Sequence, residues 1–96
     1  MPDVEELPIP ESVVAAQRKS EMARIWLADG YQVVVLSDRL WDDPGAWGLM
    51  LVYMARHVSK AYEGKGRNAA DTLLRIKAAM DAEWLNPTDL KRDSNQ

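Results

Sequence analysis

The stretch "EMARIWLADGYQVVVLSD", residues 21 to 38, decides the fold because two β-rich runs flank Asp29-Gly30. A type I′ turn needs positive φ at both central residues, and Asp-Gly is one of the pairs that adopt it most readily. The pattern therefore predicts an antiparallel hairpin in this segment. With Ala28 facing Tyr31 across the turn, the next pairs on the neighbouring face are Leu27 with Gln32, Ile25 with Val34, and Ala23 with Leu36.

Side chains along the hairpin alternate between two faces, and both faces are rich in apolar residues. One face is expected to form the core and carries Ala23, Ile25, Leu27, Val34 and Leu36. The other face carries Met22, Arg24, Trp26, Tyr31, Val33 and Val35. This second face is too apolar to be left in water, so another surface must cover it. Its expected interface residues are Trp26, Tyr31, Val33 and Val35.

Two helices are expected after the hairpin. Asp43 and Pro44 form an N-cap and first helical position, and this helix should run to about Glu63, with Gly64 in the left-handed C-cap conformation. Its main apolar arc, expected to face the hairpin, contains Trp47, Met50, Leu51, Met54, Val58, Ala61 and Tyr62. A neighbouring seam of mostly small residues contains Gly48, Val52, Ala55 and Ser59.

After a "GKGR" loop, Asn68 should open the second helix and Asn86-Pro87 should close it. On this helix one face carries Ala69, Leu73, Ile76, Met80 and Trp84.

At the other end of the chain, residues 1–10 are acidic and rich in proline, and a short helix is favoured after Pro10. The expected fold class is therefore α+β, an antiparallel hairpin packed against two long C-terminal helices, with a short N-terminal helix or strand. Residues 1–96 form one domain, with flexible tails at 1–6 and 88–96.

Composition excludes several classes of protein. The 96 residues contain no cysteine and one histidine, so disulfide frameworks, cysteine-based metal sites and multi-histidine sites within one chain are ruled out. A net charge of -3 and a pI near 5.0 disfavour nucleic acids and anionic membranes as partners. The longest apolar run, Ala46 to Ala55, is far shorter than the roughly 20 residues that span a bilayer. We expect a cytoplasmic protein that needs no cofactor or metal.

Candidate chemical groups lie on the hairpin, the loop after it and the first long helix. They are His57, Arg24, Asp38 and Asp42. His57 falls at the border of the apolar arc without an acidic residue one turn away, so it lacks the positioned partner that a general base needs. Capping and loop solvation account for the aspartates that precede the helix. No catalytic residue is therefore assigned, and the prediction leans away from an enzyme.

A two-stranded ribbon is marginal in water and leaves unpaired backbone groups along both edges. A further strand could come from the chain's own N-terminus, where Leu7 and Ile9 flank Pro8, or from an identical subunit. The leading hypothesis is a non-enzymatic homodimer that acts as a protein-interaction module. The alternative is a small enzyme or ligand-binding dimer with a site around His57, at the junction of hairpin and helix.

The segments "EMARIWLADG" and "LWDDPGAWGLMLVYMARHVSKAY" resemble a family of small bacterial proteins that carries only a domain-of-unknown-function label. The resemblance covers residues 7 to 87 and rests on Glu21, Arg24, Trp26, Trp41, Trp47, Gly48, His57 and Tyr62. It implies an α+β fold of about this length. Because that family has no assigned activity, cofactor or partner, the resemblance implies nothing about a substrate.

Overall fold

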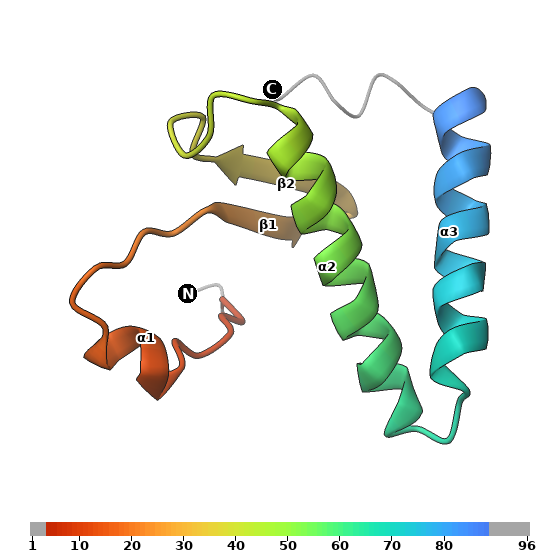
Figure 1. The fold of residues 1–96 in the computed structure, drawn as a ribbon, viewed down its shortest axis with the longest axis horizontal. Coiled ribbons are helices and arrows are strands. Elements are labelled where there is room, and N and C mark those ends of the chain that lie inside the picture. The colour runs from red at the N-terminus through yellow and green to blue at the C-terminus, as the bar shows by residue number, and fades with distance from the viewer. Residues whose placement is uncertain (1–3, 89–96) are drawn as a thin grey trace.

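The computed structural model describes residues 4–88 and shows an α+β chain with five elements. In chain order they are α1 (Glu11–Ala15), β1 (Ala23–Ala28), β2 (Tyr31–Leu36), α2 (Gly45–Glu63) and α3 (Ala69–Leu85). Figure 1 shows the hairpin behind α2, with α3 beside α2 and α1 on the opposite side of the molecule. This arrangement confirms the predicted fold class, with the N-terminal element as a short helix. Of the tails expected at 1–6 and 88–96, residues 1–3 and 89–96 lie outside the described residues.

The hairpin has the predicted turn and register. Asp29 and Gly30 have φ values of 51° and 84°, which is the pair of positive angles that a type I′ turn requires. Ala28 pairs with Tyr31, and the pairing continues without a bulge to Ala23 with Leu36. Within the described residues the sheet has only these two strands, so each strand has an edge without a neighbouring strand.

Helix α2 begins as the sequence predicts. The Oδ1 atom of Asp43 accepts a hydrogen bond from the backbone N–H of Gly45 at 2.9 Å, and Pro44 already has helical angles. An aspartate at this position satisfies an amide that has no partner within the helix, and proline in the first turn removes one amide that would need one. The main chain therefore leaves the loop and enters the helix within two residues.

The C-terminus of α2 differs from the prediction in one residue. Gly64 has a right-handed φ of -63°, whereas Gly66 has the left-handed φ of 85°. The N–H of Arg67 donates to the carbonyl of Tyr62 at 3.2 Å, and the N–H of Gly66 donates to that of Glu63 at 3.0 Å. This pair of bonds is a Schellman motif with Gly66 at the left-handed position. The chain thus continues in a helical conformation through Gly64 before it turns.

The two glycines should respond oppositely to substitution by alanine. We expect Gly66→Ala to lower the free energy of unfolding by about 1 kcal/mol, because a Cβ disfavours left-handed backbone. Gly64→Ala should be neutral or stabilising, because its backbone is right-handed and alanine loses less entropy there. Urea unfolding of the two variants measures the difference. The reverse order would mean that Gly64 is the left-handed residue, as the sequence pattern alone suggested.

Helix α3 is capped at the predicted residues. The Oδ1 atom of Asn68 accepts a hydrogen bond from the N–H of Asp71 at 3.0 Å, and Asp71 places a negative charge in the first turn. The helix ends at Leu85, directly before the Asn86-Pro87 pair. Both helices therefore take their bounds from short-range capping chemistry.

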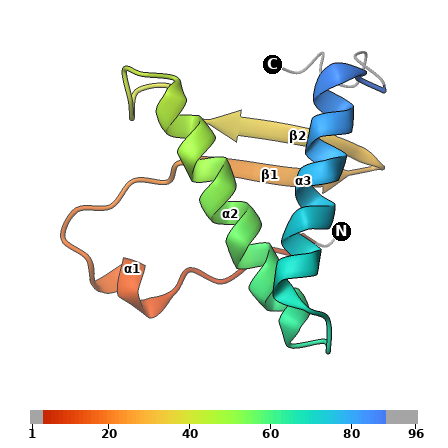
Figure 2. The ribbon, with the colours of Figure 1, turned by 45° about the vertical axis from the view of Figure 1, so that its right-hand side comes forward.

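Helices α2 and α3 pack only in the halves nearest the loop that joins them. Ser59, with 3% of its surface exposed, is the one buried residue within the described range, and its hydroxyl donates to the carbonyl of Ala55 at 3.0 Å. On the α3 side, Ala69, Leu73 and Ile76 are partly buried. Figures 1 and 2 show the two helices diverging from this contact toward their other ends. The predicted small-residue seam is confirmed in its C-terminal half.

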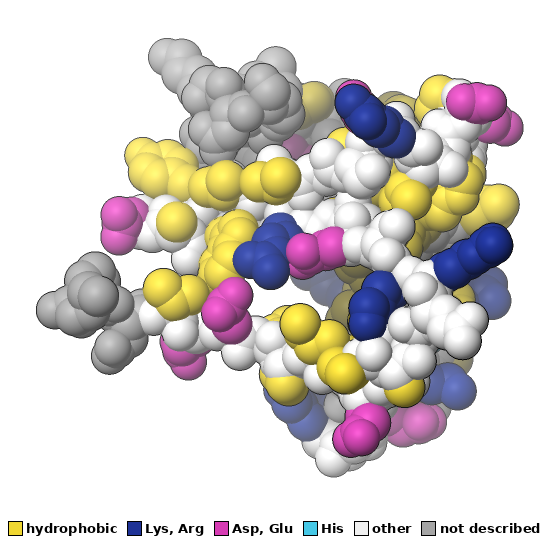
Figure 3. All heavy atoms as spheres, turned by 90° about the vertical axis from the view of Figure 1, so that its left-hand side faces the viewer, with side chains coloured by type: hydrophobic (Ala, Val, Ile, Leu, Met, Phe, Trp, Pro, Cys, Tyr) yellow, Lys and Arg dark blue, Asp and Glu magenta, His cyan; other side chains and the backbone are white. Residues whose placement is uncertain are grey.

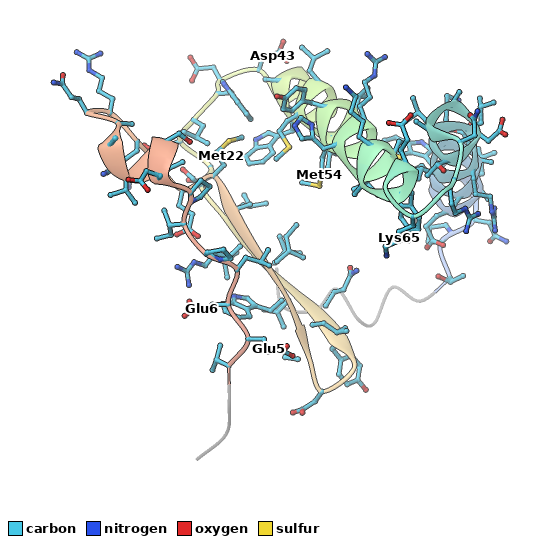
Figure 4. All side chains as sticks on the ribbon, turned by 90° about the horizontal axis from the view of Figure 1, so that it is seen from below. Glu5, Glu6, Met22, Asp43, Met54 and Lys65 are labelled. Carbon is cyan, nitrogen blue, oxygen red and sulfur yellow. The ribbon has the colours of Figure 1, made fainter. Side chains whose placement is uncertain are left out.

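The residues that flank the hairpin, rather than its strands, lie against the start of α2. Met22 precedes β1, and Figure 4 shows it near the first turns of α2. Trp41 follows β2 and packs edge-on against Trp47, with ring centroids 5.0 Å apart, and Trp47 and Leu40 are partly buried. Further along α2, Met54 points away from the helix on the side of the hairpin (Figure 4). Neither strand approaches α2 or α3 closely.

No apolar side chain is buried among the described residues. The hairpin face expected to be core is mostly exposed, with Leu27 at 78%, so that expectation is wrong for the single chain. A folded protein of 10.8 kDa should expose about 5,500 Å² and have a radius of gyration of about 12.5 Å. This chain exposes 9209 Å² and has a radius of gyration of 15.8 Å.

The N-terminal segment does not supply a third strand. Residues 4–10 have no regular secondary structure, and Leu7 is 92% exposed. Proline at positions 8 and 10 removes two backbone donors, which works against strand pairing in this stretch. The expectation that Leu7 and Ile9 could pair with the hairpin is therefore not met. No helix within the described residues is long and apolar enough to cross a membrane.

Candidate functional site

His57 lies on the fourth turn of α2 and is exposed. Its Nδ1 atom is 3.2 Å from the carbonyl oxygen of Tyr53, one turn earlier, and its ring lies 4.4 Å from the Tyr53 ring at a tilt of 56°. Within residues 4–88 it pairs with no carboxylate. These contacts hold the imidazole along the helix surface and give it no acid–base partner.

Arg24 lies on β1 and is the centre of a small ionic cluster. Its Nε atom donates to Glu21 at 2.6 Å, and its Nη1 atom lies 3.6 Å from a Glu6 carboxylate oxygen. The hydrogen bond and charge of Glu21 raise the pKa of Arg24 above its ordinary value, and Glu6 adds to the effect. The guanidinium also lies 5.9 Å from the Trp26 ring centroid. Arg24 is thus a permanent cation that ties the N-terminal segment to the hairpin.

Asp38 and Asp42 lie in the loop between β2 and α2. Neither forms a hydrogen bond or ion pair with any other residue in the described part of the chain. No three histidine, aspartate or glutamate side chains in that part are grouped so that they could hold a metal ion. The four candidate residues His57, Arg24, Asp38 and Asp42 are therefore not joined by any direct contact within one chain.

The predicted interface face of the hairpin is only partly covered by the rest of the chain. Trp26 and Val33, which are cross-strand partners, are partly buried, whereas Tyr31 and Val35 are exposed. Val35 is 59% exposed and faces Arg24 on the neighbouring strand. Figure 3 shows hydrophobic side chains reaching the surface on one side of the molecule, interspersed with charged groups.

Two features of these surfaces were not apparent from the sequence. The partners of Arg24 were missed, although Glu21 lies three residues before it and opposite charges at close spacing were a usable signal. Tyr62, assigned to the apolar arc, has Lys65 and Arg67 over its ring at 5.2 and 5.8 Å. Both cations follow it in the α2–α3 loop, and their approach depends on the Schellman turn.

The fold and surfaces define a small α+β protein. Its hairpin and helices form an open frame, by which we mean that they enclose no buried apolar side chain among the described residues. The family described as "Domain of unknown function (DUF5076)" matches residues 6–88, and the chain belongs to this family. The predicted resemblance to an uncharacterised family of small proteins is thereby confirmed. No protein with a curated description is significantly similar to the chain.

A solved structure named as a pyruvate dehydrogenase, from the photosynthetic bacterium Rhodopseudomonas palustrus, is similar over most of its length. The two chains share 31% sequence identity, and the TM-score is 0.72. The alignment covers 93% of this chain and 92% of the other. The same arrangement of hairpin and helices therefore occurs in a second protein of nearly the same length.

Proposed function

We propose that this protein is a non-enzymatic homodimer that acts as a protein-interaction module in the cytoplasm. The observation that carries the proposal is the absence of any buried apolar side chain among residues 4–88. Judged by its exposed area, the chain buries about 40% of the surface of an unfolded chain, where about 60% or more is usual at this size. A chain with so little internal burial needs a second surface to remain folded.

A second copy of the chain suits the hairpin in two ways. One of its strands could extend the sheet, which has two strands among the described residues. Pairing across a two-fold axis would also bring together the two copies of the face that contains Trp26, Tyr31, Val33 and Val35. The result is a four-stranded antiparallel sheet with one hydrophobic surface sheltered at the centre.

The mass of the protein in solution tests the proposal. We expect sedimentation at micromolar concentration to give twice the mass of one chain. Obligate homodimers commonly bury more than about 2,000 Å² in total, and the excess surface of this chain is large enough to supply that area. A folded monomer at this concentration would contradict the proposal.

A small enzyme or ligand-binding dimer with a site around His57 is the alternative, and the name of the similar solved protein supports it. If this chain shared that activity, pyruvate would be its substrate. The geometry supports the alternative less well, because among the described residues His57 contacts Tyr53 and no acidic group. Pyruvate-dependent reduction of an added electron acceptor by the purified protein, abolished in His57→Ala, would reverse the ranking.

A further inference from the structure

The apolar faces of α2 and α3 extend well beyond the region where the two helices touch. On α3 the partly buried residues Ala69, Leu73 and Ile76 are followed on the same face by Met80 and Trp84. Both are exposed, and Trp84 is exposed at 87%. On α2 the seam through Ser59 and Ala55 continues toward the N-terminus as Val52 and Gly48. Each helix therefore presents a contact face of which one half has no partner among residues 4–88.

The unpartnered halves lie at the diverging ends of the two helices (Figures 1 and 2). We define the wedge as the surface formed by Gly48, Leu51 and Val52 of α2 and Met80 and Trp84 of α3. The wedge combines the large exposed indole of Trp84 with Gly48, which has no side chain. A Cβ atom built on Gly48 would meet nothing within 4 Å, so that side of α2 has open space for a bulky group.

We propose that the wedge receives the same wedge of a second copy, so that Trp84 of each chain packs against α2 of the other near Gly48. This inference rests on the proposed homodimer and specifies which surface meets the mate. A two-fold axis makes such a contact twice. If Trp84 of one chain packs against α2 of the second, then Trp84 of the second chain packs in the same way against α2 of the first. Four helices then surround a shared apolar centre, with a large residue inserted beside a small one.

Two observations favour a second copy as the occupant. The exposed area of 9209 Å² exceeds the expected area by roughly 3,700 Å², which is more than the 800 Å² or so that a standard interface removes from each partner. The wedge also contains both a protruding group, Trp84, and a position without a side chain beside open space, Gly48, so two copies related by a two-fold axis can each supply what the other receives.

Disulfide trapping tests the contact directly, because the natural chain contains no cysteine. Gly48→Cys and Trp84→Cys proteins are mixed in equal amounts, allowed to exchange subunits and oxidised. We expect a disulfide-linked heterodimer as the main covalent product, since cysteines bond readily only when their Cα atoms lie within about 7 Å. A mixture of Gly48→Cys with Leu74→Cys is the matched control, because Leu74 is exposed on the back of α3.

A substitution series gives an independent measurement. Trp84→Asp should raise the dimer dissociation constant at least thirtyfold, and Leu74→Asp should change it less than threefold, because only the first would place a charge in the interface. A dimer that forms no trapped heterodimer and keeps its affinity in Trp84→Asp would overturn the inference and leave the proposed homodimer standing. A wild-type protein that is monomeric would overturn both.

Discussion

Val35→Asp is expected to raise the dissociation constant of the homodimer more than about 100-fold. Val35 is exposed in the single chain, on the hairpin face proposed to meet the second copy. In the dimer its replacement would bury a carboxylate in an apolar interface, which costs about 3 kcal/mol or more. Sedimentation equilibrium of the variant over a range of concentrations measures the change.

The same substitution should have little effect if the chain acts alone. Val35 is the cross-strand partner of Arg24, so an aspartate there would face a cation on the neighbouring strand. An opposite-charge pair of this kind stabilises a hairpin modestly, by tenths of a kcal/mol, and offsets part of the lower strand propensity of aspartate. Val35→Thr is the control, since it keeps the branched shape and adds one hydroxyl. Unchanged mass and stability in Val35→Asp would remove the hairpin face from the interface.

Local chemistry explains why much of the fold could be predicted from the sequence. The turn at Asp29-Gly30, the Asp43 cap and the Asn68 cap each depend on residues within three positions of one another. Such features are determined by backbone angles and short hydrogen bonds, which the residue types specify directly. The left-handed glycine was misplaced because both Gly64 and Gly66 allow the conformation. Which of them adopts it depends on how far α2 continues.

Burial could not be predicted, because it depends on what the elements pack against. Alternation along the hairpin correctly separates the two faces, but it does not say which of them the helices cover. Ile25 and Leu27 were assigned to the core by pattern alone, and both are exposed in the chain. The ion pair between Arg24 and Glu6 could not be predicted either, because the two residues are 18 positions apart and an irregular segment lies between them. Residue pattern identifies apolar surface, whereas the assembly determines whether it is sheltered.

Thermal unfolding is expected to depend on protein concentration, with the midpoint rising by about 3 to 5 °C for each tenfold increase. If folding requires the second copy, the reaction joins a folded dimer to two unfolded chains, and concentration enters the equilibrium directly. Each tenfold change contributes about 1.4 kcal/mol to dimer stability. Circular dichroism across a hundredfold range of concentration, with mass measured on the same samples, provides the test.

Loss of helical signal and loss of dimer mass should coincide in these measurements. The reason is the distribution of apolar contacts within one chain, where Ser59 is the only buried residue of the described part and neither strand of the hairpin approaches α2 closely. Hydrophobic burial on that scale does not offset the conformational entropy of ordering a chain of this length. A monomer that keeps its secondary structure on dilution and unfolds at a fixed temperature would show that the open frame is stable by itself. In that case its exposed faces would be free for other partners, and self-association would no longer be needed to explain them.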